Sequence, residues 1–317
     1  MRESKICLVI IYNHNFERNI AVLNRIYAGR FSDVFHVMPF YRGNEHNVIG
    51  VYENSYQFNG YVTQAIQRIK DEKYSHYLFV ADDMIINPSI ASWNVARKLK
   101  LDEDAGFISD FRLIDDWRFM NWTSAIPSFM NLLGGGNACE WKGFLPNAAQ
   151  AREIMASHGI NCVGGVSSRL FKVVRCGCRV MRQTAFRYSL LPPLGILRRH
   201  HSWLSSKDKL YPLVDGYSDF FSVPAGCIDD FCHYCGVFAA IRVFVEIAIP
   251  MALIFSCKKI VRLVDIGMKA ENGIEDYSVR RQLEEKFNFR YARLIAEFPH
   301  DYLYIHPVKL SKWGDLP

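Results

Sequence analysis

Two adjacent carboxylates, Asp82 and Asp83, follow directly after the apolar segment Tyr77–Val80. Charges set side by side at the end of a buried strand repel each other and lose their hydration, so they need a compensating cation. Hard carboxylate oxygens suit Mg²⁺ or Mn²⁺ that carries phosphate oxygens. The pair therefore predicts a divalent-cation site with Asp82 and Asp83 as ligands. The structural alternative is a turn or a helix cap, where the same residue type is common.

A histidine and two lysines follow the last apolar segment, Tyr302–Ile305. His306 comes directly after it, and Lys309 and Lys312 come next, beside Trp313. Imidazole can complete the coordination of Mn²⁺, and lysines can neutralise a diphosphate as point charges. The pattern predicts His306 as a third metal ligand and both lysines as phosphate contacts. The alternative is an exposed tail with incidental charges.

The elements that must position these residues alternate in type over the first hundred positions. Apolar runs predict strands at Ile6–Tyr12, Val34–Phe40, Val48–Tyr52 and Tyr77–Val80, and helical spacing predicts helices at Phe16–Tyr27 and Tyr56–Ile69. Such alternation predicts an α/β fold with a mostly parallel central sheet flanked by helices. Ligands bind at the carboxyl ends of strands in these sheets, where Asn13, Tyr41 and Asp82 fall.

The remainder of the chain is regular only in its last third. No strand–helix alternation is recognisable from Asp102 to Ser206, so we expect an insertion there. Regular patterns return as a strand-like segment at Leu213–Pro224, helical segments at Phe231–Phe255 and Ile274–Phe287, and a strand at Tyr302–Ile305. The expected organisation is a single domain with an N-terminal half (1–100), an insertion subdomain (101–209) and a C-terminal half (210–317).

The composition is that of an ordinary globular chain. Its 317 residues include 38 Lys+Arg and 32 Asp+Glu, a net charge of +6, and half of them are apolar, which excludes a disordered chain. Nine cysteines without a secretory signal predict free thiols and a cytoplasmic location. Cys232 and Cys235 have zinc-like spacing, with Cys176 and Cys178 as a second pair, but buried free thiols are the expectation. Walker A, Gly-x-Ser-x-Gly and His-Glu-x-x-His signatures are absent from the sequence.

Two stretches bear on membrane contact. Gly236–Cys257 is apolar, but Arg242 and Glu246 interrupt it, so we expect a buried helix in which these two side chains pair, with a membrane-associated helix as the alternative. The segment 165–210 carries ten Lys or Arg and one Asp. This basic segment is either a solvated face or a surface for a phosphorylated acceptor or an anionic membrane. No nucleic-acid-binding module accompanies it, so nucleic acid is not an expected partner.

Together, the acid pair, the late histidine and the lysine six positions after it resemble the nucleotide-sugar-dependent glycosyltransferases of the GT-A fold, of the bacterial polysaccharide type. In that family an Asp-x-Asp motif holds a metal on the donor diphosphate, a C-terminal His is a further ligand and a nearby Lys contacts phosphate. The resemblance implies that Asp83 is the metal-binding Asp and Asp82 the middle position of the motif. It likewise implies His306 as the C-terminal ligand and Lys312 as the phosphate contact. Ala81 stands where the family usually has its first Asp.

A catalytic base is implied by a second likeness to the same family. Glu275 and Asp276, just before a helical pattern, are similar to its x-Glu-Asp motif, whose carboxylate deprotonates the acceptor hydroxyl. An alcohol is a poor nucleophile until a base takes its proton. Glu246, inside an apolar stretch, and Asp219 are competing candidates. Acidic residues in a first helical turn also favour the helix dipole, which is the structural alternative.

The resemblance also locates the nucleotide and the substrates. It places the donor against Tyr12 and Asn13 after the first strand and against Tyr41 and Arg42 after the second, where an aromatic ring can stack on a base and Arg42 can reach a phosphate. The implied fold is GT-A-like and Rossmann-related. The implied activity is metal-assisted transfer of a sugar from a nucleoside diphosphate sugar, with UDP as the expected nucleotide, to a hydroxyl of a glycan or lipid-linked acceptor.

Two other classes of function remain open from the sequence. One is a nucleotidyltransferase that acts on a sugar phosphate, although the first strand is not followed by a glycine-rich phosphate loop. The other is a non-catalytic protein that binds a membrane surface or an anionic ligand through the basic segment. Peripheral contact with the cytoplasmic face of an anionic membrane is compatible with the transferase as well.

Overall fold

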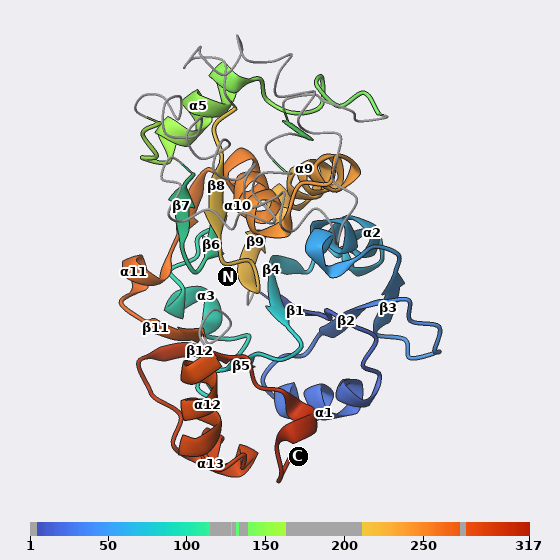
Figure 1. The fold of residues 1–317 in the computed structure, drawn as a ribbon, viewed down its shortest axis with the longest axis vertical. Coiled ribbons are helices and arrows are strands. Elements are labelled where there is room, and N and C mark those ends of the chain that lie inside the picture. Colours follow the sequence, from blue (N-terminus) through green and yellow to red (C-terminus); the bar gives the residue numbers. More distant parts are fainter. Residues whose placement is uncertain (1–4, 115–127, 129–130, 133–138, 163–210, 273–276) are drawn as a thin grey trace, which may run out of the picture.

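A seven-stranded sheet with helices on both faces forms the centre of the chain, with strand order β10-β6-β9-β4-β1-β2-β3 (Figure 1). β9 runs antiparallel to its two neighbours, and every other pairing in this sheet is parallel. The expected α/β fold with a mostly parallel central sheet is therefore confirmed. The computed structural model describes residues 5–114, 128, 131–132, 139–162, 211–272 and 277–317.

Two smaller sheets, β11-β12-β5 and β7-β8, complete the strands of the described residues. The strands are β1 (Lys5–Ile11), β2 (Val34–Pro39), β3 (Val48–Val51), β4 (Tyr74–Ala81), β5 (Ile85–Ile86), β6 (Ala105–Ile108), β7 (Phe111–Leu113), β8 (Val214–Gly216), β9 (Phe220–Pro224), β10 (Lys259–Val261), β11 (Lys269–Asn272) and β12 (Tyr302–His306). The helices are α1 (Arg18–Tyr27), α2 (Asn59–Ile69), α3 (Val95–Lys98), α5 (Ala148–Ser157), α9 (Ile228–Ala240), α10 (Val245–Ser256), α11 (Leu263–Ile266), α12 (Tyr277–Lys286) and α13 (Tyr291–Ala296), with single 3₁₀ turns at Ser55–Gln57 (η1), Ala225–Cys227 (η4) and Leu310–Lys312 (η5).

Alternating side chains along β1 divide the interior into two cores. Successive residues of a strand point to opposite faces of the sheet. Ile6, Leu8 and Ile10 pack toward α1. Cys7, Val9 and Ile11 pack toward α2 on the other face. Both faces are therefore covered, as a mostly parallel sheet requires. The stacked rings of Phe79 and Phe221, with centroids 4.6 Å apart, join β4 to β9 in the second core.

The segment expected as one strand, Leu213–Pro224, forms two. β8 pairs with β7, whereas β9 enters the large sheet between β4 and β6. The hydroxyl of Ser218 donates to the carbonyl of Gly216 at 3.1 Å, a local bond that competes with an extended ladder. The interruption leaves Tyr217 and Asp219 at the start of β9, beside the end of β4, because the amide of Ala81 donates to the carbonyl of Asp219 at 2.9 Å.

The helix expected at Phe231–Phe255 is also broken, into α9 and α10. Ile241 and Val243 are buried while Arg242 between them is exposed, in the turn that separates the two helices. Arg242 adopts a φ of 58°, in the left-handed region. The predicted pairing of Arg242 with Glu246 along one helix was therefore wrong. No helix in the described part of the chain is long and apolar enough to cross a bilayer.

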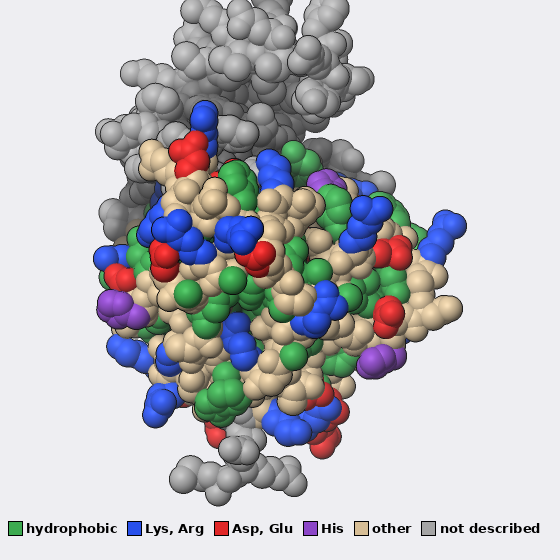
Figure 2. Space-filling view, turned by 90° about the horizontal axis from the view of Figure 1, so that it is seen from below, with side chains coloured by type: hydrophobic (Ala, Val, Ile, Leu, Met, Phe, Trp, Pro, Cys, Tyr) green, Lys and Arg blue, Asp and Glu red, His purple; other side chains and the backbone are tan. Residues whose placement is uncertain are grey.

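Charges of both signs are mixed on the face formed by α12, α13 and the C-terminal segment. The ion pairs of these elements are Arg281–Glu285, Arg290–Asp315 and Arg293–Glu297. Figure 2, which views the molecule from this side, shows Lys and Arg interspersed with Asp and Glu. Alternating signs cancel at distances beyond a Debye length, so this face carries no strong net field.

A buried polar network joins β1 to β2 beneath α1. Nδ1 of His36 lies 2.8 Å from the hydroxyl of Tyr12, and its Nε2 lies 2.8 Å from Oδ1 of Asn24. The amide of Asn47 also donates to Asn24 at 3.3 Å. Burial disfavours the charged imidazole and lowers the pKa of His36 from 6.5 to about 4. The native protein therefore holds this histidine neutral.

We expect His36 to make the fold sensitive to acid. The unfolded chain protonates this imidazole near pH 6.5 and the native state only near pH 4, so the free energy of unfolding should fall by about 3 kcal/mol as the pH drops through this window. His36→Gln, which keeps hydrogen-bonding capacity without a titrating ring, should flatten the decline measured by urea unfolding. His46→Gln, at an exposed histidine, is the control. Parallel curves for the parent protein and His36→Gln would contradict the assignment.

Candidate functional site

The turn between β4 and β5 carries the two adjacent carboxylates. β4 belongs to the large sheet and β5 to the three-stranded sheet, so only Asp82, Asp83 and Met84 lie between the two sheets. The amide of Asp82 donates to the carbonyl of Ile11 at 2.9 Å, and that of Met84 donates to Ala81 at 3.1 Å. Both aspartate side chains are buried. The backbone thus fixes two acidic groups at the carboxyl edge of the large sheet.

β12 brings His306 to the same turn. This strand pairs antiparallel with β5, with Ile305 opposite Ile85, so the residue after Ile305 faces the residues before β5. Nε2 of His306 lies 2.9 Å from Oδ1 of Asp83, 223 positions earlier in the sequence. The structure therefore brings the acid pair and the late histidine together, as the sequence predicted.

Lys309 completes the contacts of Asp83. Its ammonium forms an ion pair with Oδ2 of Asp83, and the amide of Val308 donates to the Asp83 carbonyl at 2.6 Å. The Lys309 side chain is 42% exposed, whereas that of Asp83 is 8% exposed, so the lysine reaches the carboxylate from the surface. Lys312 is exposed in η5. Both predicted phosphate-contacting lysines therefore follow closely on His306, one at the carboxylate and one on the surface.

The two aspartates are in opposite electrostatic environments. Burial alone would raise the pKa of Asp83, but the hydrogen bond and charge of His306 and Lys309 outweigh it and hold the pKa well below its ordinary range. Burial and the neighbouring charge of Asp83 raise the pKa of Asp82 to about 7, against a hydrogen bond from Asn19 at 3.0 Å. Burial lowers the pKa of His306, but the hydrogen bond and charge of Asp83 raise it by more, so the net shift of the pKa is upward.

Two residues from the start of β9 also contact the cluster. The hydroxyl of Tyr217 lies 2.6 Å from Nδ1 of His306, and its ring stacks on Tyr304 with centroids 6.0 Å apart. Oδ2 of Asp219 lies 4.0 Å from Nε2 of His306, and burial raises the pKa of this carboxyl. Tyr217 was not predicted as a site residue and Asp219 was predicted only as a competing base, because it is the break between β8 and β9 that turns both toward the site.

The donor atoms at the turn suit a divalent cation only in part. Nε2 of His306 and Oδ1 of Asp83 lie 2.9 Å apart as a hydrogen-bonded pair, so both atoms could ligate one cation only after this nitrogen gives up its hydrogen. Asp82 is held by Asn19 instead. No group of three or more His, Cys, Asp or Glu side chains within the described ranges is arranged to hold a metal. A cation at this turn would therefore have two protein ligands, and a diphosphate and water would supply the others.

Two aromatic residues expected to contact the nucleotide are buried instead. Tyr12 extends the inward-facing series of β1, and its hydroxyl bonds to His36, so its ring cannot stack on a ligand. Tyr41 is turned inward because Phe40 before it has a φ of 59°. A side chain at Gly43 would collide with the Tyr41 hydroxyl, since its Cβ would lie 2.2 Å away. The stacking role predicted for Tyr12 and Tyr41 was wrong.

Different aromatic rings are exposed at this edge of the sheet. Phe40, after β2, is 56% exposed and Tyr52, after β3, is 63% exposed. The two rings meet edge to face with centroids 6.1 Å apart. Arg42 is exposed and Asn13 is half-buried at the ends of the neighbouring strands. The carboxyl edge therefore presents an aromatic pair, of which Phe40 directly precedes the predicted Tyr41 and Tyr52 was not predicted.

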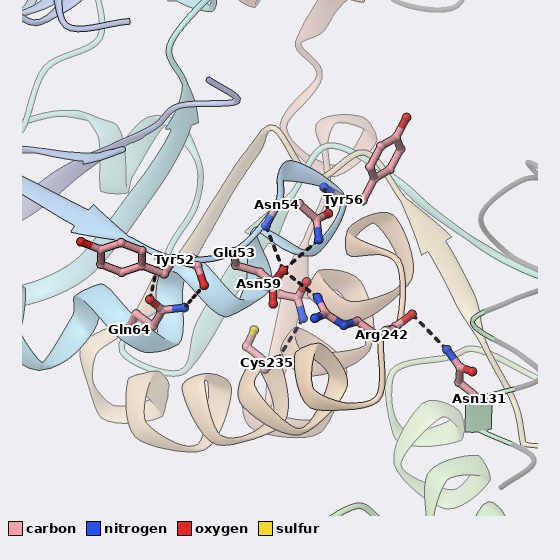
Figure 3. Close-up of polar contacts among 9 residues, drawn as sticks. All are labelled: Tyr52, Glu53, Asn54, Tyr56, Asn59, Gln64, Asn131, Cys235 and Arg242. Atoms are coloured by element: carbon pink, nitrogen blue, oxygen red, sulfur yellow. Dashed lines mark hydrogen bonds and ion pairs between the residues drawn. The ribbon is translucent and has the colours of Figure 1, made fainter. Parts of the chain in front are cut away.

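The end of β3 is linked to the connection between α9 and α10 (Figure 3). Nη1 of Arg242 contacts Oε1 of Glu53 at 2.6 Å, and the side-chain amide of Asn54 donates to the same oxygen at 2.8 Å. The side chain of Asn59 donates to the carbonyl of Cys235 at 2.9 Å. Arg242 thus pairs across the sheet edge with Glu53, at the border of the exposed aromatic surface.

Several predicted residues lie elsewhere or outside the described ranges. Glu246 is half-buried in the first turn of α10. Glu275 and Asp276 lie outside the described residues, as do the whole of the basic segment 165–210 and its cysteines at 176 and 178. Cys232 and Cys235 are buried free thiols in α9, as expected.

The cluster around Asp83 is chemically suited to bind an anion and to exchange protons. It joins a carboxylate, an imidazole and an ammonium at the ligand-binding edge of a parallel sheet. No protein-family model, curated protein or solved structure matches the chain. The chemistry of the site therefore has to be inferred from these contacts alone.

We expect the buried contact between Asp83 and His306 to be energetically coupled. In a double-mutant cycle of Asp83→Asn and His306→Gln, urea unfolding at pH 7 should give a coupling of about 1–3 kcal/mol, because a charge-assisted bond at a buried position is lost in both single variants. The exposed pair Lys269–Asp301, which joins β11 to the start of β12, should couple much more weakly. Equal coupling for the two pairs would show that the Asp83 contact has no special role.

Proposed function

We propose that the chain is a glycosyltransferase that moves a sugar from a nucleoside diphosphate sugar to a hydroxyl of a glycan or lipid-linked acceptor, with the help of a divalent cation. The observation that carries this proposal is the contact of Asp83 with both His306 and Lys309. It unites an acidic turn in the first third of the chain with a cationic segment near its end. A diphosphate leaving group requires both kinds of residue at one place.

Lys309 has the position of a phosphate contact in this mechanism. Its side chain is partly exposed, whereas its partner Asp83 is buried. A bound diphosphate can therefore replace Asp83 as the partner of the ammonium with little change in backbone conformation. Lys312 adds a second positive charge on the adjoining turn. A divalent cation held by Asp83 and His306, when bound, would stabilise the negative charge that develops on the leaving diphosphate.

The exposed aromatic pair supports a place for the nucleotide. Phe40 and Tyr52 lie after β2 and β3, on the same sheet edge as Asp83. A ring that is more than half exposed can stack on a planar base without disturbing the core. Arg42 on the loop after Phe40 is available for a phosphate or ribose contact.

Two carboxylates are the main candidates for the base that activates the acceptor. Asp276, with Glu275 beside it, is favoured by the resemblance to the GT-A family. Asp219 is favoured by its position, 4.0 Å from His306, and by burial, which raises its pKa and so makes the carboxylate a better proton acceptor. Glu246 is the third candidate, since Ser218, next to Asp219, donates to the carbonyl of Val245 at 3.3 Å.

The proposed setting is the cytoplasmic side of a membrane that carries the acceptor. The ten Lys or Arg of 165–210 support contact with an anionic lipid surface or a phosphorylated acceptor. The mixed charges in Figure 2 argue against the α12–α13 face as the membrane-facing side.

Nucleoside diphosphate binding should require the residues of the turn. Saturating UDP with Mn²⁺ should raise the melting temperature by about 5 °C through mass action. Asp83→Asn and His306→Gln should lose the Mn²⁺-dependent part of this shift, and Lys309→Met should lose most of the remainder. Lys269→Met, at an exposed lysine paired with Asp301, is the control. If all three site variants respond like the parent protein, the turn does not bind the donor.

The base can be identified by separating binding from turnover. Asn at the base position should preserve the UDP-dependent thermal shift and lower sugar transfer by about 10²- to 10⁴-fold. The variant still binds the donor but has no group that accepts the proton of the acceptor hydroxyl. Asp276→Asn and Asp219→Asn should be compared by release of nucleoside diphosphate from the donor. The variant with this loss marks the base. Full turnover by both variants would exclude both residues and transfer the role to Glu246.

A further inference from the structure

A cavity lies at the edge strand β10, away from the turn that carries Asp83. Its volume is about 440 Å³, within the range of small-molecule sites in proteins. β10 is three strand positions from β4 in the large sheet, a separation of roughly 14 Å. α11 and β7, two of the elements that line the cavity, lie at the left of Figure 1.

The charged residues that line this cavity are mostly basic. They are Lys100, which follows α3, Lys259 and Arg262 from β10 and the residue after it, and one acid, Asp265 of α11. Two lysines and an arginine converge on one hollow from two separate parts of the chain. Asp265 pairs with Arg262 at 3.6 Å and Asp102 pairs with Lys259, so three positive charges face two negative charges. The cavity keeps a net positive charge, and walls of low dielectric concentrate its field.

The present partners of these cations leave them available. Lys259 pairs with Asp102 at 2.8 Å, but both side chains are more than half exposed. Lys100 donates to the backbone carbonyl of Asp265 at 2.6 Å and forms no ion pair with another of the described residues. The carboxylate of Asp265 is itself held by the amide of Arg262 at 2.8 Å, as a helix cap. Exposed ion pairs contribute little stability, so an incoming anion can replace them readily.

Neutral groups complete the walls in a way that suits a phosphate ester. Nε2 of His158 donates to the carbonyl of Ile254 at 3.0 Å, which fixes this ring at the wall of the cavity. The ring of Phe111 lies beneath the guanidinium of Arg262, with 5.3 Å to its centroid. The cavity thus offers several cationic donors and an apolar surface for the body of a ligand.

We propose that this cavity is a binding site for a phosphate-bearing small molecule, held by Lys100, Lys259 and Arg262. Phosphate oxygens match both the point charges of the lysines and the fork of the guanidinium. The site is independent of the proposed transferase function, because none of its residues belongs to the Asp83 cluster.

Calorimetric titration with sodium pyrophosphate tests the proposal. The full chain carrying Lys309→Met is used, so that binding at the Asp83 turn does not contribute. Pyrophosphate should still bind to this protein, and adding Lys259→Glu should weaken that binding about tenfold or more, as expected for loss and reversal of a charge-assisted contact. Lys100→Gln provides a second variant should Lys259→Glu fail to fold.

Lys258→Glu is a closely matched control. Lys258 is the adjacent residue, is also exposed, and pairs with Asp104 at 2.9 Å much as Lys259 pairs with Asp102, but it does not line the cavity. The same change of net charge at this position should alter the affinity by less than about threefold, through screened long-range effects alone. Equal weakening by Lys258→Glu and Lys259→Glu, or no pyrophosphate binding in the Lys309→Met protein, would overturn the proposal.

Discussion

Charge compensation at Asp83 is the constraint on which the arrangement of the two sheets depends. Two adjacent carboxylates are buried where the chain leaves the large sheet, and such groups are costly unless cations meet them. His306 and Lys309 provide that compensation, and both arrive through the pairing of β12 with β5. Docking of the last strand and formation of the site are therefore one event. The low pKa of Asp83 follows from it, whereas burial and the neighbouring charge of Asp83 raise the pKa of Asp82.

The sequence allowed a good prediction of what depends on local pattern. The alternation of apolar runs and helical spacing identified the strands and helices of the first hundred residues and hence the mostly parallel sheet. The same reasoning placed Asp83 and His306 at strand ends, although the two meet through the antiparallel pairing of β12 with β5 and not within the large sheet. These inferences succeeded because burial periodicity is a property of short segments.

The remaining features depend on backbone conformations that composition does not reveal. The left-handed backbone conformation of Phe40 leaves its ring exposed and the ring of Tyr41 buried. The sequence therefore predicted an exposed aromatic residue on the right loop but at the wrong position. Tyr12 was misjudged because the hydrogen-bonding partner that buries it, His36, lies on the next strand. The helix break at Arg242 and the strand break at Ser218 have the same origin, since tertiary contacts decided each one. Tyr217 entered the site only through such a break.

The three-residue passage from β4 to β5 has a consequence for how the chain tolerates change. Asp82, Asp83 and Met84 span two sheets, and the amides of Asp82 and Met84 and the carbonyls of Asp83 and Met84 are hydrogen-bonded, so the length of the passage is constrained. An insertion or deletion of one residue here would shift the register of the turn, so that a residue other than Asp83 would face the imidazole of His306. Loops at other strand ends can lengthen freely, but the spacing of this turn has to stay fixed in any descendant that keeps the site.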